Sequence, residues 1–130
     1  MILPVLRLLI PPGGGTSEAI LDVGSVENYM RDEVEGALQT LRDLGVTDAW
    51  YWYRYGSYEG EGDLIVIDGQ GLWGIYSMAH CSCYGPLENM YKSSFTWRPS
   101  RDELMAACSD WERERVGMLL GQIPRLKGEA

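Results

Sequence analysis

The 130-residue sequence contains no long apolar run and few basic residues. Its longest apolar stretch, Ile2 to Ile10, is interrupted by Pro4 and Arg7 and is far shorter than the roughly 20 residues that a membrane-spanning helix needs. No basic region precedes this stretch, and the segment Pro11 to Gly15 follows it where a secretory signal would have a small-residue cleavage site. We therefore expect a cytoplasmic protein whose N-terminal stretch forms a strand.

The shortage of positive charge argues against nucleic-acid binding. The chain has 11 lysines and arginines against 19 aspartates and glutamates, which gives a net charge of −8. Affinity for nucleic acid comes mainly from basic side chains that displace counterions from phosphates, so direct binding is not expected. The charge is also uneven, because residues 27 to 68 hold ten carboxylates and three arginines, whereas residues 69 to 130 hold seven charges of each sign. This distribution predicts an acidic face.

Cysteine is scarce as well. The three cysteines are an odd number, and Cys81 and Cys83 lie too close in sequence for an easy disulfide. We expect reduced thiols.

The remaining composition predicts one folded domain spanning residues 1–130. Apolar residues make up 45% of the chain and charged residues 23%, a balance that supports a packed core. Apolar residues recur with helical spacing from Val26 to Leu41, with Ser25 placed to cap this helix and Gly45 to end it. Residues 1–15 are interpreted as the N-terminal strand and a flexible linker, because consecutive prolines and glycines interrupt regular structure.

The middle of the chain predicts three antiparallel strands. Trp50 to Tyr55 is almost wholly aromatic, and a strand here would place tryptophans on one face and tyrosines on the other. A glycine-rich loop over 56–62 separates it from a strand over 64–67, and the turn sequence Asp68 to Gly71 leads into a strand over 72–79. The predicted fold class is α+β, an antiparallel β-meander of three to four strands packed with two helices.

The second helix follows an irregular stretch that ends at Pro99. Ser100 and Glu103 form the S-x-x-E pattern of a capping box, which marks the start of this helix. One stripe of the helix is expected to pack against the sheet. Its residues are Leu104, Ala107, Cys108 and Trp111. The tail, residues 121–130, is expected to fray.

The single histidine, His80, adjoins two of the three thiols. Together with Cys108, the residues His80, Cys81 and Cys83 have the composition of a zinc site with three cysteines and one histidine. However, the spacing differs from the C-x₂₋₄-C pairs of structural zinc sites, and neighbouring strand residues point to opposite faces. We therefore expect small buried thiols near a turn and no cofactor, with zinc as the alternative.

The same segment suggests a second alternative, a thiol enzyme, since an adjacent imidazole can lower the pKa of a thiol. No helix N-terminus or basic cluster lies nearby in sequence to stabilise a thiolate. Catalysis is therefore less favoured, and no catalytic residue is assigned.

Carboxylates alternate with glycines from Glu59 to Asp63, as at the start of a calcium loop, but Gln70 stands where an acidic residue would complete such a site. A solvated hairpin tip is expected instead. A binding surface is predicted beside this tip, because tyrosine is enriched at recognition surfaces. Its candidate residues are Tyr53, Tyr55, Ser57, Tyr58, Glu59, Glu61, Asp63 and Tyr84. For the aromatic strand itself, the favoured interpretation is that it only fills the core and covers the sheet faces, because aromatic side chains are common in strands.

Two motifs in this region, YGSYEG at residues 55–60 and HCSCYGP at residues 80–86, resemble a group of small proteins of bacteriophage and bacterial genomes that has no established activity. The resemblance covers about residues 50 to 88, less than a third of the chain. It implies a phage or prophage origin and no particular mechanism.

These features together predict a non-enzymatic phage accessory protein that binds a host protein, such as a defence component with a basic surface, through its acidic and aromatic surface. The main alternative is a protein that binds zinc, a small ligand or a substrate at the turn from His80 to Cys83 and the loop from Tyr55 to Asp63. A virion component is the third alternative. Neither nucleic acid nor a membrane is expected as a partner, and a homodimer is left open.

Overall fold

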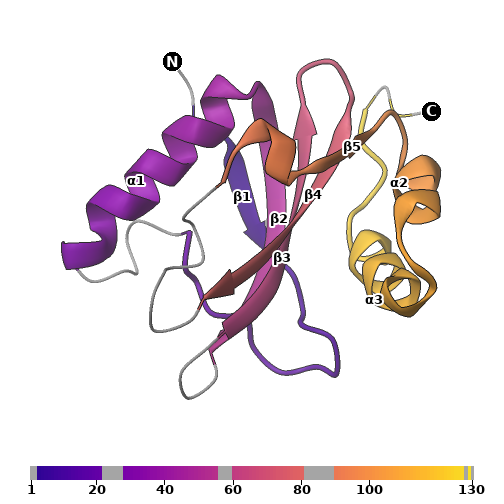
Figure 1. Cartoon of the computed structure of the whole chain (residues 1–130), viewed down its shortest axis with the longest axis horizontal. Coiled ribbons are helices and arrows are strands. Elements are labelled where there is room, and N and C mark those ends of the chain that lie inside the picture. The colour runs from indigo at the N-terminus through magenta and orange to yellow at the C-terminus, as the bar shows by residue number, and fades with distance from the viewer. Residues whose placement is uncertain (1–2, 22–27, 56–59, 81–89, 128, 130) are drawn as a thin grey trace.

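The computed structural model describes residues 3–21, 28–55, 60–80, 90–127 and 129. In chain order its elements are β1 (Val5–Leu8), α1 (Asn28–Asp43), β2 (Val46–Tyr55), β3 (Gly60–Asp68), β4 (Trp73–His80), the 3-10 helix η1 (Lys92–Ser94), β5 (Thr96–Arg98), α2 (Arg101–Ala107) and α3 (Asp110–Gly121). The strands form one sheet, with α1 on one face and α2 and α3 on the other (Figure 1).

The five strands are arranged in the order β1-β2-β3-β4-β5. β1 pairs in parallel with β2, and each of the other pairs is antiparallel. The predicted α+β class and the meander of β2, β3 and β4 are confirmed. Two further elements, β5 and α3, were not predicted: β5 lies in the stretch expected to be irregular, and α3 is a separate helix.

The aromatic strand β2 separates two apolar cores, as its alternation predicted. Tyr51 and Tyr53 belong to the core beneath α1, and Trp50 and Trp52 belong to the core beneath α2 and α3. All four side chains are buried. Both faces of this strand are therefore covered.

The boundaries of α1 and of the β3–β4 turn also agree with their local sequence. Gly45 follows α1 with a φ of 87°, and its N–H donates to the carbonyl of Arg42. In the turn, one carboxylate oxygen of Asp68 accepts the N–H groups of Gln70 and Leu72, each at 2.9 Å. Ser25 and Val26 lie outside the described residues.

The predicted second helix is in fact two helices. α2 ends at Ala107 because Cys108 is extended, and Ser109 starts α3 with a second capping box that it forms with Glu112. The single stripe predicted from Leu104 to Trp111 is therefore wrong, and the side chain of Trp111 is 76% exposed. The sequence did contain the signal, since S-x-x-E occurs at residues 100–103 and again at residues 109–112.

Residues near both chain ends contact the rest of the domain. The guanidinium of Arg54 donates to the carbonyls of Pro12 and Gly14, at 3.0 and 3.3 Å, so the proline-glycine linker is tied to β2. In the tail, expected to fray, Ile123 is buried and Glu129 pairs with Arg101. The expected flexibility of the linker and fraying of the tail remain predictions.

β3 begins earlier than predicted, at Gly60, so Gly62 lies within the strand and not in a loop. It pairs with Tyr53, and a Cβ built on it would stand 2.2 Å from the backbone oxygen of Trp52. Glycine at this position permits the close approach of β2 and β3.

We expect Gly62→Ala to lower the free energy of unfolding by about 1 to 3 kcal/mol, because the added methyl group must displace backbone. Gly36→Ala is the matched control, since Gly36 is an exposed position within α1 whose Cβ would meet nothing within 4 Å. It should raise the free energy of unfolding by about 1 kcal/mol through helix propensity. Urea titrations measure both, and equal stability of Gly62→Ala and the parent would contradict the close approach.

Candidate functional site at the sheet edge

The predicted binding surface is only partly accessible. Tyr53 is fully buried and the side chain of Asp63 is 2% exposed, so neither can contact a partner in this structure. Glu61 is exposed on β3, and Tyr55 ends β2. His80 ends β4 and pairs with Gly60. The other predicted residues lie outside the described part of the chain: Ser57, Tyr58, Glu59, Cys81, Cys83 and Tyr84.

Asp63 is instead the centre of a buried polar cluster. Its carboxylate accepts the indole N–H of Trp52 at 2.8 Å and pairs with Arg115 of α3, whose Nε lies 3.0 Å away. Burial raises the pKa of Asp63, while the charge of Arg115 and the hydrogen bond from Trp52 act in the opposite direction. Arg115 also lies 3.6 Å from a carboxylate oxygen of Glu112. This cluster fastens α3 to the sheet.

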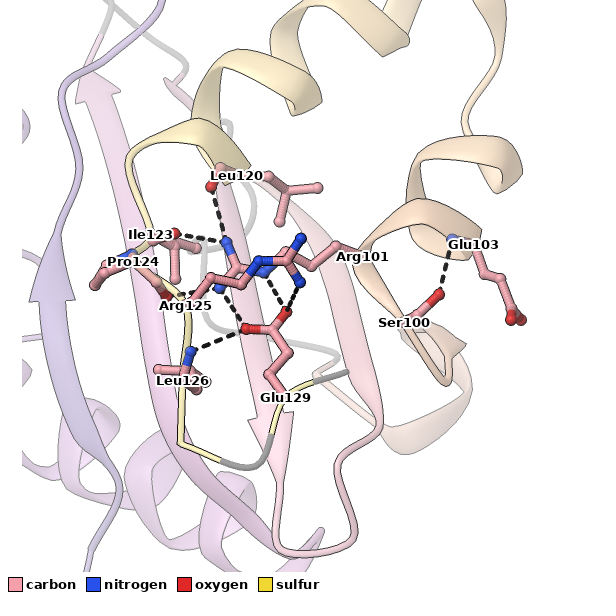
Figure 2. A network of polar contacts seen from close by, with 9 residues as sticks. All are labelled: Ser100, Arg101, Glu103, Leu120, Ile123, Pro124, Arg125, Leu126 and Glu129. Carbon is pink, nitrogen blue, oxygen red and sulfur yellow. Dashed lines mark hydrogen bonds and ion pairs between the residues drawn. The ribbon is translucent and has the colours of Figure 1, made fainter.

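A second cluster closes the C-terminal end of α3. Arg101 donates to the carbonyls of Leu120, Ile123 and Pro124 and forms a two-pronged ion pair with Glu129 (Figure 2). Its guanidinium also stands 4.6 Å from the ring centroid of Trp73. A cavity of about 340 Å³ adjoins these residues. Because the guanidinium is already engaged, its role is to hold the tail against α2.

The environment of Cys108, the thiol among the described residues, favours the protonated form over the nucleophilic thiolate. Its Sγ donates to the carbonyl of Leu104 at 3.4 Å, and burial raises the pKa of the thiol, which disfavours the thiolate. It lines a cavity of about 210 Å³ with Ser77 and Glu112. Among the described residues no group of three or more His, Cys, Asp or Glu side chains could hold a metal ion. Cys81 and Cys83, on which the zinc prediction depends, are not among them.

The open edge of the sheet at β1 has different properties. The N–H of Leu9 donates to the carbonyl of Tyr51 at 2.8 Å, so odd-numbered residues of this stretch point their backbone groups toward β2. Alternation then points the backbone groups of Leu6, Leu8 and Ile10 away from β2. No described strand pairs with this side of β1.

Gln122 occupies one end of this open edge. Its side-chain oxygen accepts the N–H of Ile10 at 2.8 Å, and its side-chain nitrogen donates to the carbonyl of Ile10 at 3.0 Å. The amide thus makes the two hydrogen bonds that a neighbouring strand would make. The outward backbone groups of Leu6 and Leu8 remain available.

An apolar groove of about 520 Å³ lies beside the available groups. Pro4, Leu6, Arg7 and Leu8 form the wall on the side of β1, and Leu38 of α1, together with Leu21 and Tyr51, forms the rest. Leu8 is 51% exposed, while the three residues of the inner wall are at most 5% exposed. A side chain placed next to β1 would therefore meet mainly Leu8 and the partly buried Leu6, because the inner wall is almost inaccessible.

Exposed apolar side chains are concentrated along the same segment. Among the described residues seven large apolar side chains are exposed, and four of them lie between residues 3 and 10. They are Leu3, Val5, Leu8 and Ile10. Exposed apolar patches beside unpaired strand edges are typical of interaction sites.

The opposite edge strand, β5, differs from β1. It is only three residues long and is followed by Pro99, and both features protect an edge from pairing.

No protein-family model, curated protein or solved structure matches the chain. None of the helices in the described ranges has the length and apolar character needed to cross a membrane.

The raised pKa of Asp63 predicts a pH effect on stability. Because the folded protein holds the Asp63 proton more strongly than the unfolded chain does, stability from this group falls as pH rises from about 3.8 through the raised pKa. Asp63→Asn should remove this decline while keeping an acceptor for Trp52. Asp63→Ala leaves the indole N–H and Arg115 without this partner and should cost about 3 to 5 kcal/mol. Urea unfolding from pH 3 to pH 8 measures the stability of both variants. If the free energy of unfolding depends on pH in the same way in the parent and in Asp63→Asn, the predicted effect of Asp63 is wrong.

Glu129 predicts the opposite dependence. The hydrogen bond from Arg101 lowers the pKa of this carboxyl below 4.5, so its stabilising contribution is present at neutral pH and lost as pH falls through the lowered pKa. Glu129→Gln should remove that loss. Arg101→Ala also deprives three carbonyls of their donor and should cost about 2 to 4 kcal/mol at pH 7. If Arg101→Ala unfolds at the same urea concentration as the parent, the cluster does not hold the tail.

Proposed function

We propose that the protein acts by binding another protein, and that it does so by accepting an extended segment of that partner along the open edge of β1. The observation that carries this proposal is the pair of outward-facing residues Leu6 and Leu8, whose backbone groups lie beside the apolar groove. In strand addition, backbone hydrogen bonds supply affinity, and pockets for alternate side chains supply specificity.

This proposal retains the predicted mode of action and moves the contact surface. The case for binding through the acidic and aromatic surface around residues 53–63 is weaker than predicted, because Tyr53 and Asp63 face the interior. The net charge of −8 still favours approach by a partner with a basic surface, since charge acts over longer distances than contact. A host protein remains the proposed partner, on the phage origin that the resemblance implies.

Three ionisable groups that adjoin the sheet and α3 favour binding over catalysis. Asp63 is paired with Arg115, and Glu112 caps the first turn of α3. The Cys108 thiol donates to a backbone carbonyl, and its pKa is raised. Each of these groups already has a structural partner.

Leu8→Pro tests the proposal. Proline at this position removes an N–H that points away from β2, so one edge donor is lost while pairing with β2 is kept. Leu8→Val is the matched control, because it keeps the donor and an apolar side chain. Bacterial proteins retained by the immobilised parent and by Leu8→Val should be lost from Leu8→Pro, at both low and moderate salt.

Thermal unfolding of the three proteins accompanies this comparison, to establish that each is folded. A folded Leu8→Pro that retains the same proteins as the parent would show that the edge of β1 is not the binding site.

A further inference from the structure

We propose, building on the binding mode above, that the segment bound at β1 carries apolar side chains at two alternate positions and an acidic side chain between them. The two sides of β1 differ in chemistry, and a strand added to its edge would meet both. Its side chains opposite Leu6 and Leu8 would face the groove. Its side chain opposite Arg7 would face the other side of the sheet.

The groove specifies the apolar positions. Side chains directly opposite one another on paired strands have their Cβ atoms about 4.5 to 5.5 Å apart. Residues paired with Leu6 and Leu8 would therefore contact these two side chains at the mouth of the groove, whose inner wall is formed by the buried Leu21 and Leu38. An apolar side chain there would bury apolar surface against the exposed Leu8 and the partly buried Leu6, which a polar side chain would not.

Arg7 specifies the acidic position. Its guanidinium stands 5.5 Å from the ring centroid of Trp50 and forms an ion pair with Asp48 through Nη1 at 3.2 Å, so it is held beside the edge and a second carboxylate would share it with Asp48. The Arg7 side chain is nevertheless 50% exposed. It is the only charged residue within β1, and opposite charges on paired strands attract.

The open edge is also limited in length. Pro4 precedes β1 and has no N–H to donate, and the outward groups of Ile10 are held by Gln122. Pairing is therefore confined to Leu6 and Leu8. A short alternating segment suffices to occupy the edge.

A second copy of the chain fits this edge poorly. If two β1 strands paired antiparallel with Leu6 opposite Leu8 of the other copy, the two Arg7 side chains would stand directly opposite each other. Like charges in this arrangement are destabilising. The charge at Arg7 thus selects a different sequence with a carboxylate at that place.

Synthetic peptides test this inference with the full chain. The probe is an end-blocked seven-residue peptide in which two valines flank one glutamate within a serine and threonine background. One control replaces the glutamate with lysine, and another replaces both valines with serine. Titration of the ¹⁵N-labelled protein should shift the amide signals of Leu6 and Leu8, with the glutamate peptide binding roughly three- to tenfold more tightly than the lysine peptide. The serine control should show no saturable shift.

Arg7→Gln provides the matched protein control, because it keeps a long polar side chain without the charge. The preference for the glutamate peptide over the lysine peptide should disappear in this variant. Equal binding of the two peptides to the parent would overturn the acidic position while leaving the retention experiment with Leu8→Pro as the separate test of strand addition.

Two other outcomes would overturn the inference as a whole. One is that no peptide shifts the signals of Leu6 and Leu8. The other is a dimer at micromolar concentration that Leu8→Pro dissociates and Leu8→Val does not, because a second copy would then occupy the edge.

Discussion

β2 and β3 are buried on both faces, and the arrangement of the other elements depends on this constraint. Along β2, Tyr51 and Tyr53 require an apolar layer on one side, and Trp50 and Trp52 require one on the other. α1 supplies the first layer, and α2 with α3 supplies the second (Figure 1). In the described part of the chain, the sheet can therefore offer its backbone to another molecule only at an edge. The edge at β1 combines outward backbone groups with an apolar groove, which is why we propose that binding occurs there.

The same constraint explains the buried charge. Asp63 lies on the face of β3 that α3 covers, so its carboxylate requires partners within the protein. Arg115 and the indole of Trp52 provide them, at a desolvation cost that apolar packing alone would avoid. The arrangement is selective, because α3 satisfies the carboxylate only when Arg115 faces β3. We infer that this pair contributes more to the position of α3 than to overall stability.

Features with local signals were predictable from the sequence, and features that join distant segments were not. The alternation of β2, the turn at Asp68 and the end of α1 at Gly45 each depend on neighbouring residues, and each was confirmed. The break between α2 and α3 also had a local signal, in the second capping box, which the apolar stripe concealed. In contrast, Asp63 and Arg115 are 52 residues apart, and Arg101 and Glu129 are 28 apart. Nothing in the sequence around either partner of these pairs indicates the other. For the proposed binding site, the apolar residues of the N-terminal stretch predicted a strand, and only its parallel pairing at the sheet edge shows that Val5 and Leu8 are exposed.

The side chain of Gln122 shortens the exposed apolar edge and so reduces its tendency to pair with other strands. Unpaired strand edges promote indiscriminate pairing, and proteins usually protect them with prolines, charges, bulges or covering segments. Here the amide of Gln122 satisfies both outward groups of Ile10, and Pro4 lacks a donor at the other end. Each hydrogen bond of this kind contributes only about 1 kcal/mol net, but together the two remove one residue from the available edge. With Arg7 between them, Leu6 and Leu8 leave an edge that is short and carries a charge, and both features disfavour pairing with most strands. The strand addition proposed above accounts for this limited opening, because such an edge would admit only a short segment of matching charge.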